Sequence, residues 1–464
     1  MADNEKNIRD DLFYTQKNGY DLIDTEERLE LERYCGEYMS YLDASRTERE
    51  AVREGIALAE SKGFVPYEKG MALTPGTKVY LNNRGKSLLL AVIGAKPLSF
   101  GANIAAAHVD APRLDLKQIP LYEDGEIAYF KTHYYGGIKK YQWVTIPLEL
   151  HGVVVKKDGE CVDVVIGRDK DDPKLVITDL LPHLGKDQMA KTASDVIPGE
   201  NLNILIGSVP YADDGSDRVK LAVMSLLNDR YGITEEDFLS AELEAVPAYD
   251  VCDLGLDRSL IGGYGHDDRV CAYAEMAAIC ECELPERTAV CILADKEEIG
   301  SVGVSGMQSE AFEAFMADLC ETQGVALRDC LWNSFCVSAD VCNAYDPNFP
   351  EVSEKRNGAK INYGMGICKF TGHGGKSGAS DASAEVVGTL RRIFAENGVV
   401  WQMAELGKVD QGGGGTVALY MADRNIDTID AGVPVLSMHA PFETVSKFDC
   451  YMTYKGMKAF YINR

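Results

Sequence analysis

Apolar runs and segments with helical periodicity alternate through much of the chain. Residues 25–62 predict two helices, and Thr47 with Glu50 three positions later predicts a capping box at the start of the second. The same periodicity predicts helices at residues 269–284, 383–397 and 446–462. Short apolar runs predict two strands within residues 77–95 and single strands at 103–110, 288–294, 335–339 and 432–438. We therefore predict an α/β fold with a doubly wound, mostly parallel sheet flanked by helices.

Between residues 119 and 248 the pattern changes. Short stretches of alternating apolar and polar residues are separated by turn residues, which predicts a β-rich unit. A chain of 464 residues is longer than one core usually fills, so we predict two domains. Residues 1–118 and 249–464 form the larger domain, and residues 119–248 are inserted into it.

Ligand-type side chains follow the predicted strands where each strand ends. His108 and Asp110 lie two positions apart after one apolar run, so a strand would point both to the same side. The later strand ends and the stretch GGYGHDDRV add further candidates: Asp267, Asp268, Asp295, Glu297, Glu298, Asp340 and His439. The carboxyl ends of strands in an open α/β sheet face one crevice. We therefore expect the four strands to lie in one sheet and their side chains to converge.

Histidines and carboxylates without cysteine form a nitrogen and oxygen ligand set that suits zinc, manganese or cobalt. Two ions that share one bridging carboxylate need five protein ligands, and the chain supplies them in His108, Asp267, Glu298, Asp340 and His439. Glu297 and Glu298 are adjacent and cannot both face one metal in the same way. One can bind metal while its neighbour acts as a general base.

Each of these motifs also has a purely structural explanation. A histidine at a strand end is usually only hydrogen-bonded, paired glutamates are often exposed surface, and Asp-Asp at a helix start is first an N-cap. Repetition decides between the explanations, because four apolar strands all end in ligand-type residues. We therefore predict two divalent metal ions per subunit.

Composition narrows the possible partners and the compartment. With 73 acidic and 47 basic residues the net charge is −26, which disfavours nucleic acid and anionic membrane surfaces. The start MADNEKNIRDDLF has no leader pattern, and the chain has no apolar run near membrane-spanning length. Its thirteen cysteines include no C-x-x-C pair and suggest reduced thiols. We expect a cytoplasmic protein.

Eight motifs occur in the order of a known family: AAAHVDAPRL, YYGGI, ITDLLPHL, GHDDR, DKEEIGS, SADVCNAYDPNF, GGGGT and MHAPFE. The chain resembles the aspartyl aminopeptidase family of dinuclear zinc exopeptidases, which also contains the vacuolar aminopeptidase of yeast. The resemblance implies that His108 and Asp340 hold one metal, that Glu298 and His439 hold the other, and that Asp267 bridges them. It also implies that Asp110 orients His108, that Glu297 is the general base, and that the Asp267–Asp268 peptide bond is cis.

The resemblance also extends to assembly and substrate. It implies that the inserted domain forms dimers, which assemble into a tetrahedral dodecamer. His183 matches a histidine that helps to hold substrate in a neighbouring subunit, and Lys360 matches a lysine that meets an acidic substrate side chain. The chain departs from the family pattern at Asn343 and at residues 346–349, so its preference among N-terminal residues stays open.

The main functional hypothesis is a metal-dependent aminopeptidase that hydrolyses the N-terminal residue from peptides with a metal-activated water. The glycine-rich stretch DQGGGGTVA can bind peptide carbonyls through its backbone amides, or can simply form a tight turn. One alternative is an amidohydrolase of the same fold that acts on acylated amino acids. Another is a non-catalytic assembly protein that keeps the metals, although a purely structural site has no use for Glu297 as a base.

Overall fold

A computed structural model describes residue 8 and residues 12–463. Most of the N-terminal stretch on which the expectation of no leader peptide rested lies outside these residues. Within them, no helix is both long and apolar enough to cross a membrane.

A nine-stranded sheet forms the centre of the larger unit, in the order β1-β2-β3-β13-β4-β14-β20-β16-β18. The strands are β1 (Val65–Pro66), β2 (Lys78–Asn83), β3 (Ser87–Val92), β13 (Thr288–Ala294), β4 (Ala102–His108), β14 (Phe335–Ser338), β20 (Asp427–Gly432), β16 (Met365–Cys368) and β18 (Trp401–Met403). The block β13-β4-β14-β20 is parallel throughout, whereas β3 and β16 pair antiparallel with its two edges. The predicted α/β class is confirmed, with a sheet that is mixed toward its edges.

Helices cover both faces of this sheet. One face packs against α2 (Thr25–Ala44), α3 (Glu48–Ser61), α6 (His266–Cys280), α9 (Ala384–Glu396) and α11 (Lys447–Ile462), and the other packs against α7 (Ala311–Glu321), α8 (Leu327–Trp332) and α10 (Ala418–Ala422). Alternate residues of the buried strands enter the two cores. Ala105 and Ala107 of β4 join the first core, and Ile104 and Ala106 join the second. The sheet is therefore doubly wound, as predicted.

Local signals placed several of these elements correctly. The predicted capping box is present at the start of α3, where the Glu50 amide donates to Thr47 Oγ1 at 3.2 Å and the Thr47 amide donates to Glu50 Oε2 at 3.1 Å. The two strands predicted within residues 77–95 form the β2–β3 hairpin. Its turn carries positive φ angles at Arg84 and Gly85, a combination that matches the twist of antiparallel strands.

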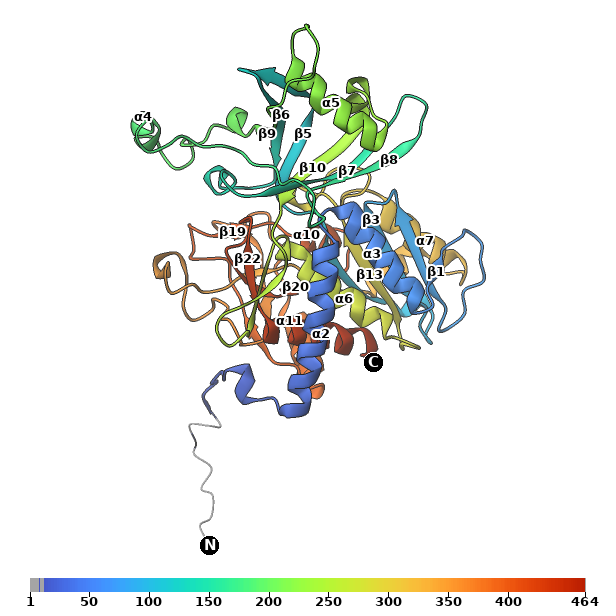
Figure 1. Cartoon of the computed structure of the whole chain (residues 1–464). Coiled ribbons are helices and arrows are strands. Elements are labelled where there is room, and N and C mark those ends of the chain that lie inside the picture. The colour runs from blue at the N-terminus through green and yellow to red at the C-terminus, as the bar shows by residue number, and fades with distance from the viewer. Residues whose placement is uncertain (1–7, 9–11, 464) are drawn as a thin grey trace.

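The inserted unit is a six-stranded antiparallel sheet in the order β8-β7-β10-β5-β6-β9, with its own core (Figure 1). Its strands are β5 (Arg113–Asp124), β6 (Ile127–Tyr135), β7 (Leu148–Val155), β8 (Cys161–Ile166), β9 (Ile204–Gly207) and β10 (Ala241–Pro247). Helix α5 (Arg218–Tyr231) packs against this sheet. The segment between β8 and β9, which carries the short α4 (Lys186–Met189), extends from the unit and is called the arm below. The sheet thus begins six residues before the predicted boundary at residue 119 and ends at Pro247.

A five-stranded sheet contains β11 (Cys252–Leu254), β12 (Leu260–Gly263), β22 (Glu443–Ser446), β21 (Pro434–Leu436) and β15 (Cys342–Asn343) in this order. The run at 432–438 was predicted as one strand of the main sheet, and this is wrong. Residues 427–432 form β20 of the main sheet, and after Val433 the chain continues as β21 in the five-stranded sheet. Pro434 has no N–H group to continue the first ladder. A ribbon of β17 (Gly372–His373) and β19 (Gly413–Gly414) completes the strands of the described residues.

Candidate metal centre

Two groups of ligand-type side chains lie side by side and share one carboxylate. His108, Asp267 and Asp340 form the first group, and Asp267, Glu298 and His439 form the second. Within each group the ligand atoms lie within 4.8 Å of one another. Two sites that share Asp267 could hold a pair of ions with that carboxylate between them.

The first group is built by neighbouring strands of the main sheet. His108 is the last residue of β4, and Asp340 follows the end of β14, which pairs parallel with β4. Asp267 stands at the start of α6, and the peptide bond between Asp267 and Asp268 is cis, as expected. The carboxyl ends of these strands therefore face one point, in agreement with the general rule for open α/β sheets.

The second group draws on two different sheets. Glu298 belongs to the short 3₁₀ turn Glu297–Ile299, which follows β13 of the main sheet. His439 follows β21 of the five-stranded sheet and has a φ angle of +63°. The expectation that all four strands lie in one sheet is therefore wrong, although the side chains still converge. A positive φ is uncommon outside glycine, and here the contacts of His439 hold it.

Both imidazoles are oriented by backbone carbonyls. His108 Nδ1 lies 3.0 Å from the carbonyl oxygen of Asp110, and His439 Nδ1 lies 2.8 Å from that of Gly137. A carbonyl only accepts, so Nδ1 carries a proton in each ring, and Nε2 is the nitrogen that can bind a metal once it has lost its own proton. The two Nε2 atoms each lie 3.2 Å from a different oxygen of Asp267. The rings are thus arranged to bind metal through Nε2.

Asp110 accepts several hydrogen bonds from groups beside the metal centre. Its Oδ1 accepts from the Glu297 amide at 3.1 Å and lies 3.3 Å from His108 Nδ1. Its Oδ2 accepts from the Glu298 amide at 3.2 Å and from the Tyr135 hydroxyl at 2.8 Å. This buried carboxylate therefore fixes the backbone of the turn that carries the two glutamates, besides contacting the histidine.

Glu443 plays a corresponding structural part in the second group. Its Oε2 accepts from the Asp267 amide at 3.0 Å, and its Oε1 accepts from the His439 amide at 2.6 Å. One buried carboxylate thus joins the backbones of a ligand from each sheet. Glu443 is the glutamate of the motif MHAPFE, and the sequence does not predict this role for it. Neither its residue type nor its position four residues after His439 marks Glu443 as a functional residue in the sequence.

The electrostatics of the centre favour cations. Burial raises the pKa of Glu298 and of Asp340 well above their ordinary values, and the Asp267 carboxylate adds to the effect. In Asp267, hydrogen bonds from His108 and His439 outweigh burial and lower the pKa. The buried Glu298 Oε1 has no hydrogen-bond partner among the described residues. Several buried carboxylates around one point, one of them with an oxygen that accepts no hydrogen bond, fit a divalent cation.

Glu297 belongs to neither ligand group but lies beside both. Its side chain is 19% exposed, and Oε2 lies 3.9 Å from His108 Nε2. Burial raises its pKa to about 6, which is closer to neutral than an ordinary glutamate. A carboxyl group with such a pKa, at the edge of a metal site, can exchange protons near neutral pH.

A cleft of about 460 Å³ opens onto the centre. Asp267, Glu297, Glu298, Asp340 and His439 line one part of it. Residues 370–374 and 412–416, which include the glycine-rich stretch, line another part. Four of the five candidate ligands therefore face a cleft that could hold a short peptide segment, whereas His108 is buried.

Both predicted substrate residues, His183 and Lys360, lie outside the cleft of this chain. Lys360 is not among the residues that line the cleft, its amino group lies 5.3 Å from the centre of the Tyr363 ring, and its backbone pairs with the Gln402 side chain. His183 is exposed on the arm of the inserted unit, away from the cleft of its own chain. Lys360 therefore has no contact with the centre that would favour the predicted role.

The chain is similar over most of its length to one protein family and to individual members of it. Residues 41–461 match the family model described as aminopeptidase I zinc metalloprotease (M18). A probable M18 family aminopeptidase 1 from Clostridium acetobutylicum is 50% identical over 462 residues, which are 98% of this chain and 99% of that protein. The corresponding protein of Thermotoga maritima is 44% identical over 435 residues, covering 93% and 96% of the two chains.

Solved structures show the same similarity. An M18 family aminopeptidase from Thermotoga maritima superposes with a TM-score of 0.94 at 42% identity, covering 97% of this chain and all of that one. Aminopeptidase I from Clostridium acetobutylicum gives 0.92 at 48% identity, covering 98% and 100%. The dodecamer of mApe1 from S. cerevisiae gives 0.76 at 20% identity over 94% and 97% of the chains, which shows a shared fold.

Proposed function

Because the chain belongs to the M18 family of aminopeptidase I zinc metalloproteases, we propose that it removes N-terminal residues from peptides with two metal ions and Glu297 as general base. Its activity as a metal-dependent aminopeptidase follows from that family. The two-ion arrangement and the role of Glu297 are our proposal. We expect both ions to be zinc, with manganese or cobalt as possible substitutes.

One observation carries the proposal. The two ligand groups share Asp267, and a separate carboxylate, Glu297, lies next to them at the surface of the cleft. A structural metal site is usually closed by its ligands and needs no free base. The combination of a shared carboxylate with an adjacent, largely buried glutamate therefore favours hydrolysis over a purely structural role.

In this proposal the candidate ligands bind the two ions. His108 and Asp340 would hold one ion, Glu298 and His439 the other, and Asp267 would bridge them. Divalent ions held in this way supply Lewis acidity, which lowers the pKa of water and polarises a peptide carbonyl.

Proton transfer falls to Glu297 in this proposal. Its carboxylate takes a proton from the attacking water as the new C–O bond forms, and gives it to the amine nitrogen as the C–N bond breaks. Asp110 keeps the base in place, because it accepts from the amides of both Glu297 and Glu298. Residues 413–415 line the cleft, and their backbone could bind peptide carbonyls, whereas the Gly412 amide already donates to the Lys408 carbonyl at 2.9 Å.

We also propose that the inserted unit assembles subunits, first into dimers and then into a dodecamer. The fold is shared with the dodecamer of mApe1, and the arm of the unit exposes Leu180, Leu184 and Met189. In such an assembly His183 would reach the cleft of a neighbouring subunit. The thirteen cysteines are all free, which is consistent with a cytoplasmic location.

The test compares the wild type with Glu297→Gln. Leucyl, aspartyl and N-acetylated chromogenic substrates are offered with and without chelator, and bound metal is measured in parallel. We expect the wild type to cleave a substrate with a free N-terminus and to lose this activity with chelator. The variant should lose about 100-fold or more in kcat, within the usual range for a general base, while retaining both ions.

Glu396→Gln is the matched control, because this glutamate is exposed on α9 and is not among the residues that line the cleft. It should behave like the wild type. Cleavage of acylated substrates alone would favour the amidohydrolase. Undiminished turnover by Glu297→Gln would remove the proposed base, and no turnover by the metal-loaded wild type would favour the assembly protein.

A further inference from the structure

The segment Tyr135-Gly136-Gly137 contacts both halves of the metal centre. The Tyr135 hydroxyl donates to Asp110 Oδ2 at 2.8 Å, and the Gly137 carbonyl accepts from His439 Nδ1 at 2.8 Å. Tyr135 is the last residue of β6, and the two glycines follow it directly. Since β6 is a strand of the inserted sheet, the inserted unit supplies contacts to a centre whose ligands all come from the larger unit.

The contact at Asp110 is a strong one. Both groups are buried, and Asp110 Oδ2 accepts from the Tyr135 hydroxyl and from the Glu298 amide. Burial, together with the neighbouring Asp110 carboxylate, raises the pKa of Tyr135, so the hydroxyl stays protonated and donates. A phenol donating to a buried carboxylate is a charge-assisted hydrogen bond.

Gly136 approaches the second metal site more closely than another residue could. Its φ angle is +76°, and a Cβ atom built there would lie 3.2 Å from Glu298 Oε2 and 3.4 Å from Glu298 Cβ. The positive φ angle favours glycine, and a Cβ atom at this position would push the Glu298 side chain aside by a few tenths of an ångström. The close fit allows the Gly137 carbonyl to reach the imidazole of His439.

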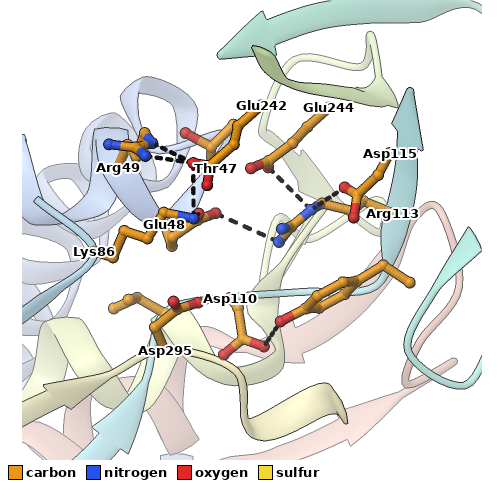
Figure 2. A network of polar contacts seen from close by, with 12 residues as sticks. Thr47, Glu48, Arg49, Lys86, Asp110, Arg113, Asp115, Glu242, Glu244 and Asp295 are labelled. Atoms are coloured by element: carbon orange, nitrogen blue, oxygen red, sulfur yellow. Dashed lines mark hydrogen bonds and ion pairs between the residues drawn. The ribbon is translucent and has the colours of Figure 1, made fainter. Parts of the chain in front are cut away.

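A network of buried charges holds Tyr135 in turn. The guanidinium of Arg113 lies 3.9 Å from the centre of the Tyr135 ring, directly across the β5–β6 pair. Figure 2 shows Arg113 between Glu48, Asp115 and Glu244, with ion-pair distances of 3.4, 2.8 and 3.2 Å. Glu48 belongs to α3 of the larger unit, whereas Glu244 belongs to β10 of the inserted sheet. The ring is therefore fixed where the two units meet.

We propose that Tyr135-Gly136-Gly137 is a positioning segment, by which the inserted unit holds both metal sites in their working geometry. Tyr135 acts through Asp110 on His108 and on the turn that carries Glu297. The glycines act on Glu298 and His439. The inserted unit would then contribute to catalysis within its own subunit, in addition to any role in assembly. The effect on turnover depends on the proposed function, whereas the effect on metal binding does not.

The first test removes one hydroxyl group. Tyr135→Phe is compared with Tyr454→Phe, a buried tyrosine of α11 that donates to the Glu281 carboxylate at 2.7 Å. Zinc affinity is measured by titrating the metal-free protein against a chelating dye, and kcat and KM are measured separately. We expect Tyr135→Phe to lose about 10-fold to 100-fold in zinc affinity or kcat, as is usual for partners of metal ligands, with little change in KM.

The metal-free proteins supply a second measurement. Hydrogen exchange in peptides that cover residues 296–300 should be faster in Tyr135→Phe than in the wild type, because Asp110 holds the Glu297 and Glu298 amides less firmly. Tyr454→Phe should leave these peptides unchanged. Equal zinc affinity, equal kcat and equal exchange in the two variants would overturn the role of Tyr135.

The second test concerns the glycines. Gly136→Ala is compared with Gly159→Ala, which has a φ of +90° in the same unit but open space around a built Cβ. Backbone strain alone would affect both variants similarly. We expect Gly136→Ala to bind one zinc ion about tenfold more weakly and Gly159→Ala to bind as the wild type does. Equal zinc binding by the two would overturn the role of the glycines. A wild type that binds zinc but cleaves no peptide would contradict the proposed function and leave the role of the segment in metal binding untouched.

Discussion

At the scale of single residues, the metal centre depends on buried carboxylates that bind backbone amides. Asp110 holds the turn with Glu297 and Glu298, and Glu443 joins Asp267 to His439. An ionised carboxylate accepts hydrogen bonds at both oxygens and donates none, so it suits two N–H groups that converge on it. The positive φ of His439 is held where one of these bonds forms.

Replacement of Glu443 by glutamine should weaken the second metal site. The amide keeps the size of the carboxylate, but its NH₂ group faces an N–H donor and cannot accept from it. We expect Glu443→Gln to bind one zinc ion about tenfold more weakly, as measured by dye competition and by metal content after dialysis.

Asp449→Asn provides the matched control for this variant. Asp449 is buried in α11 and accepts from the amides of Asn362 and Gly364 at 2.8 and 2.6 Å, away from the candidate ligands. It should lose stability without losing zinc. If both variants bind zinc alike, Glu443 is only a structural residue.

At the scale of elements, the start of α3 is tied to the inserted sheet. Glu50 closes the capping box with one oxygen, and its other oxygen lies 2.8 Å from His151 Nδ1 of β7. His151 Nε2 lies 3.3 Å from Glu149 of the same strand. Two carboxylates therefore face one buried imidazole, with Arg46 and Arg168 near Glu149.

This arrangement predicts a pH-dependent stability. Burial opposes the charged form of His151, but Glu149 and Glu50 outweigh it and raise its pKa. The folded protein thus binds this proton more tightly than the unfolded chain does. The stabilisation is complete below the ordinary histidine pKa of about 6.5 and is lost as the pH rises through the raised pKa.

Denaturant unfolding of the wild type and of His151→Gln at a series of pH values checks this prediction. The variant should be less stable by about 3 kcal/mol at the acidic end, where a buried charge pair is broken, and the difference should shrink as the pH rises. His133→Gln, at an exposed histidine of β6, is the control and should change the stability little. A constant difference for His151→Gln would contradict the assignment.

At the scale of the whole molecule, two units with separate cores meet beside the metal centre (Figure 1). Residues 135–137, at the end of a strand of the inserted sheet, contact the metal centre, and the arm extends away from the larger unit. The arm carries exposed leucines although the chain as a whole has a charge of −26. Apolar side chains on an otherwise acidic surface favour contact with another subunit.

If the arm holds subunits together, a charged residue in it should reduce the mass of the assembly. Leu184, which is 70% exposed, is replaced by aspartate, and the mass in solution is measured by light scattering. We expect the wild type to form a large homo-oligomer and Leu184→Asp to form a smaller one, because a buried carboxylate without a partner is costly. Leu256→Asp, at a fully exposed leucine of the larger unit, should keep the wild-type mass. Identical masses for all three proteins would contradict a role for the arm.

The sequence alone determined the types of the long elements and the chemistry of the centre. Period and capping are local, so α3 could be located from Thr47 and Glu50, and β13 from one apolar run. Ligand-type residues after the apolar runs and in the stretch GGYGHDDRV identified the five candidate ligands, and the family resemblance divided them into two groups around Asp267.

Only the tertiary structure decided which strands pair and what supports the ligands. His439 lies 302 positions from Gly137, and no local pattern relates two residues so far apart. The assignment of β21 to a separate sheet, the bonds of Glu443 and the contact of Tyr135 with Asp110 all arise from such long-range packing. Periodicity tells which side of a strand is buried, whereas partners are chosen by the fit of whole surfaces.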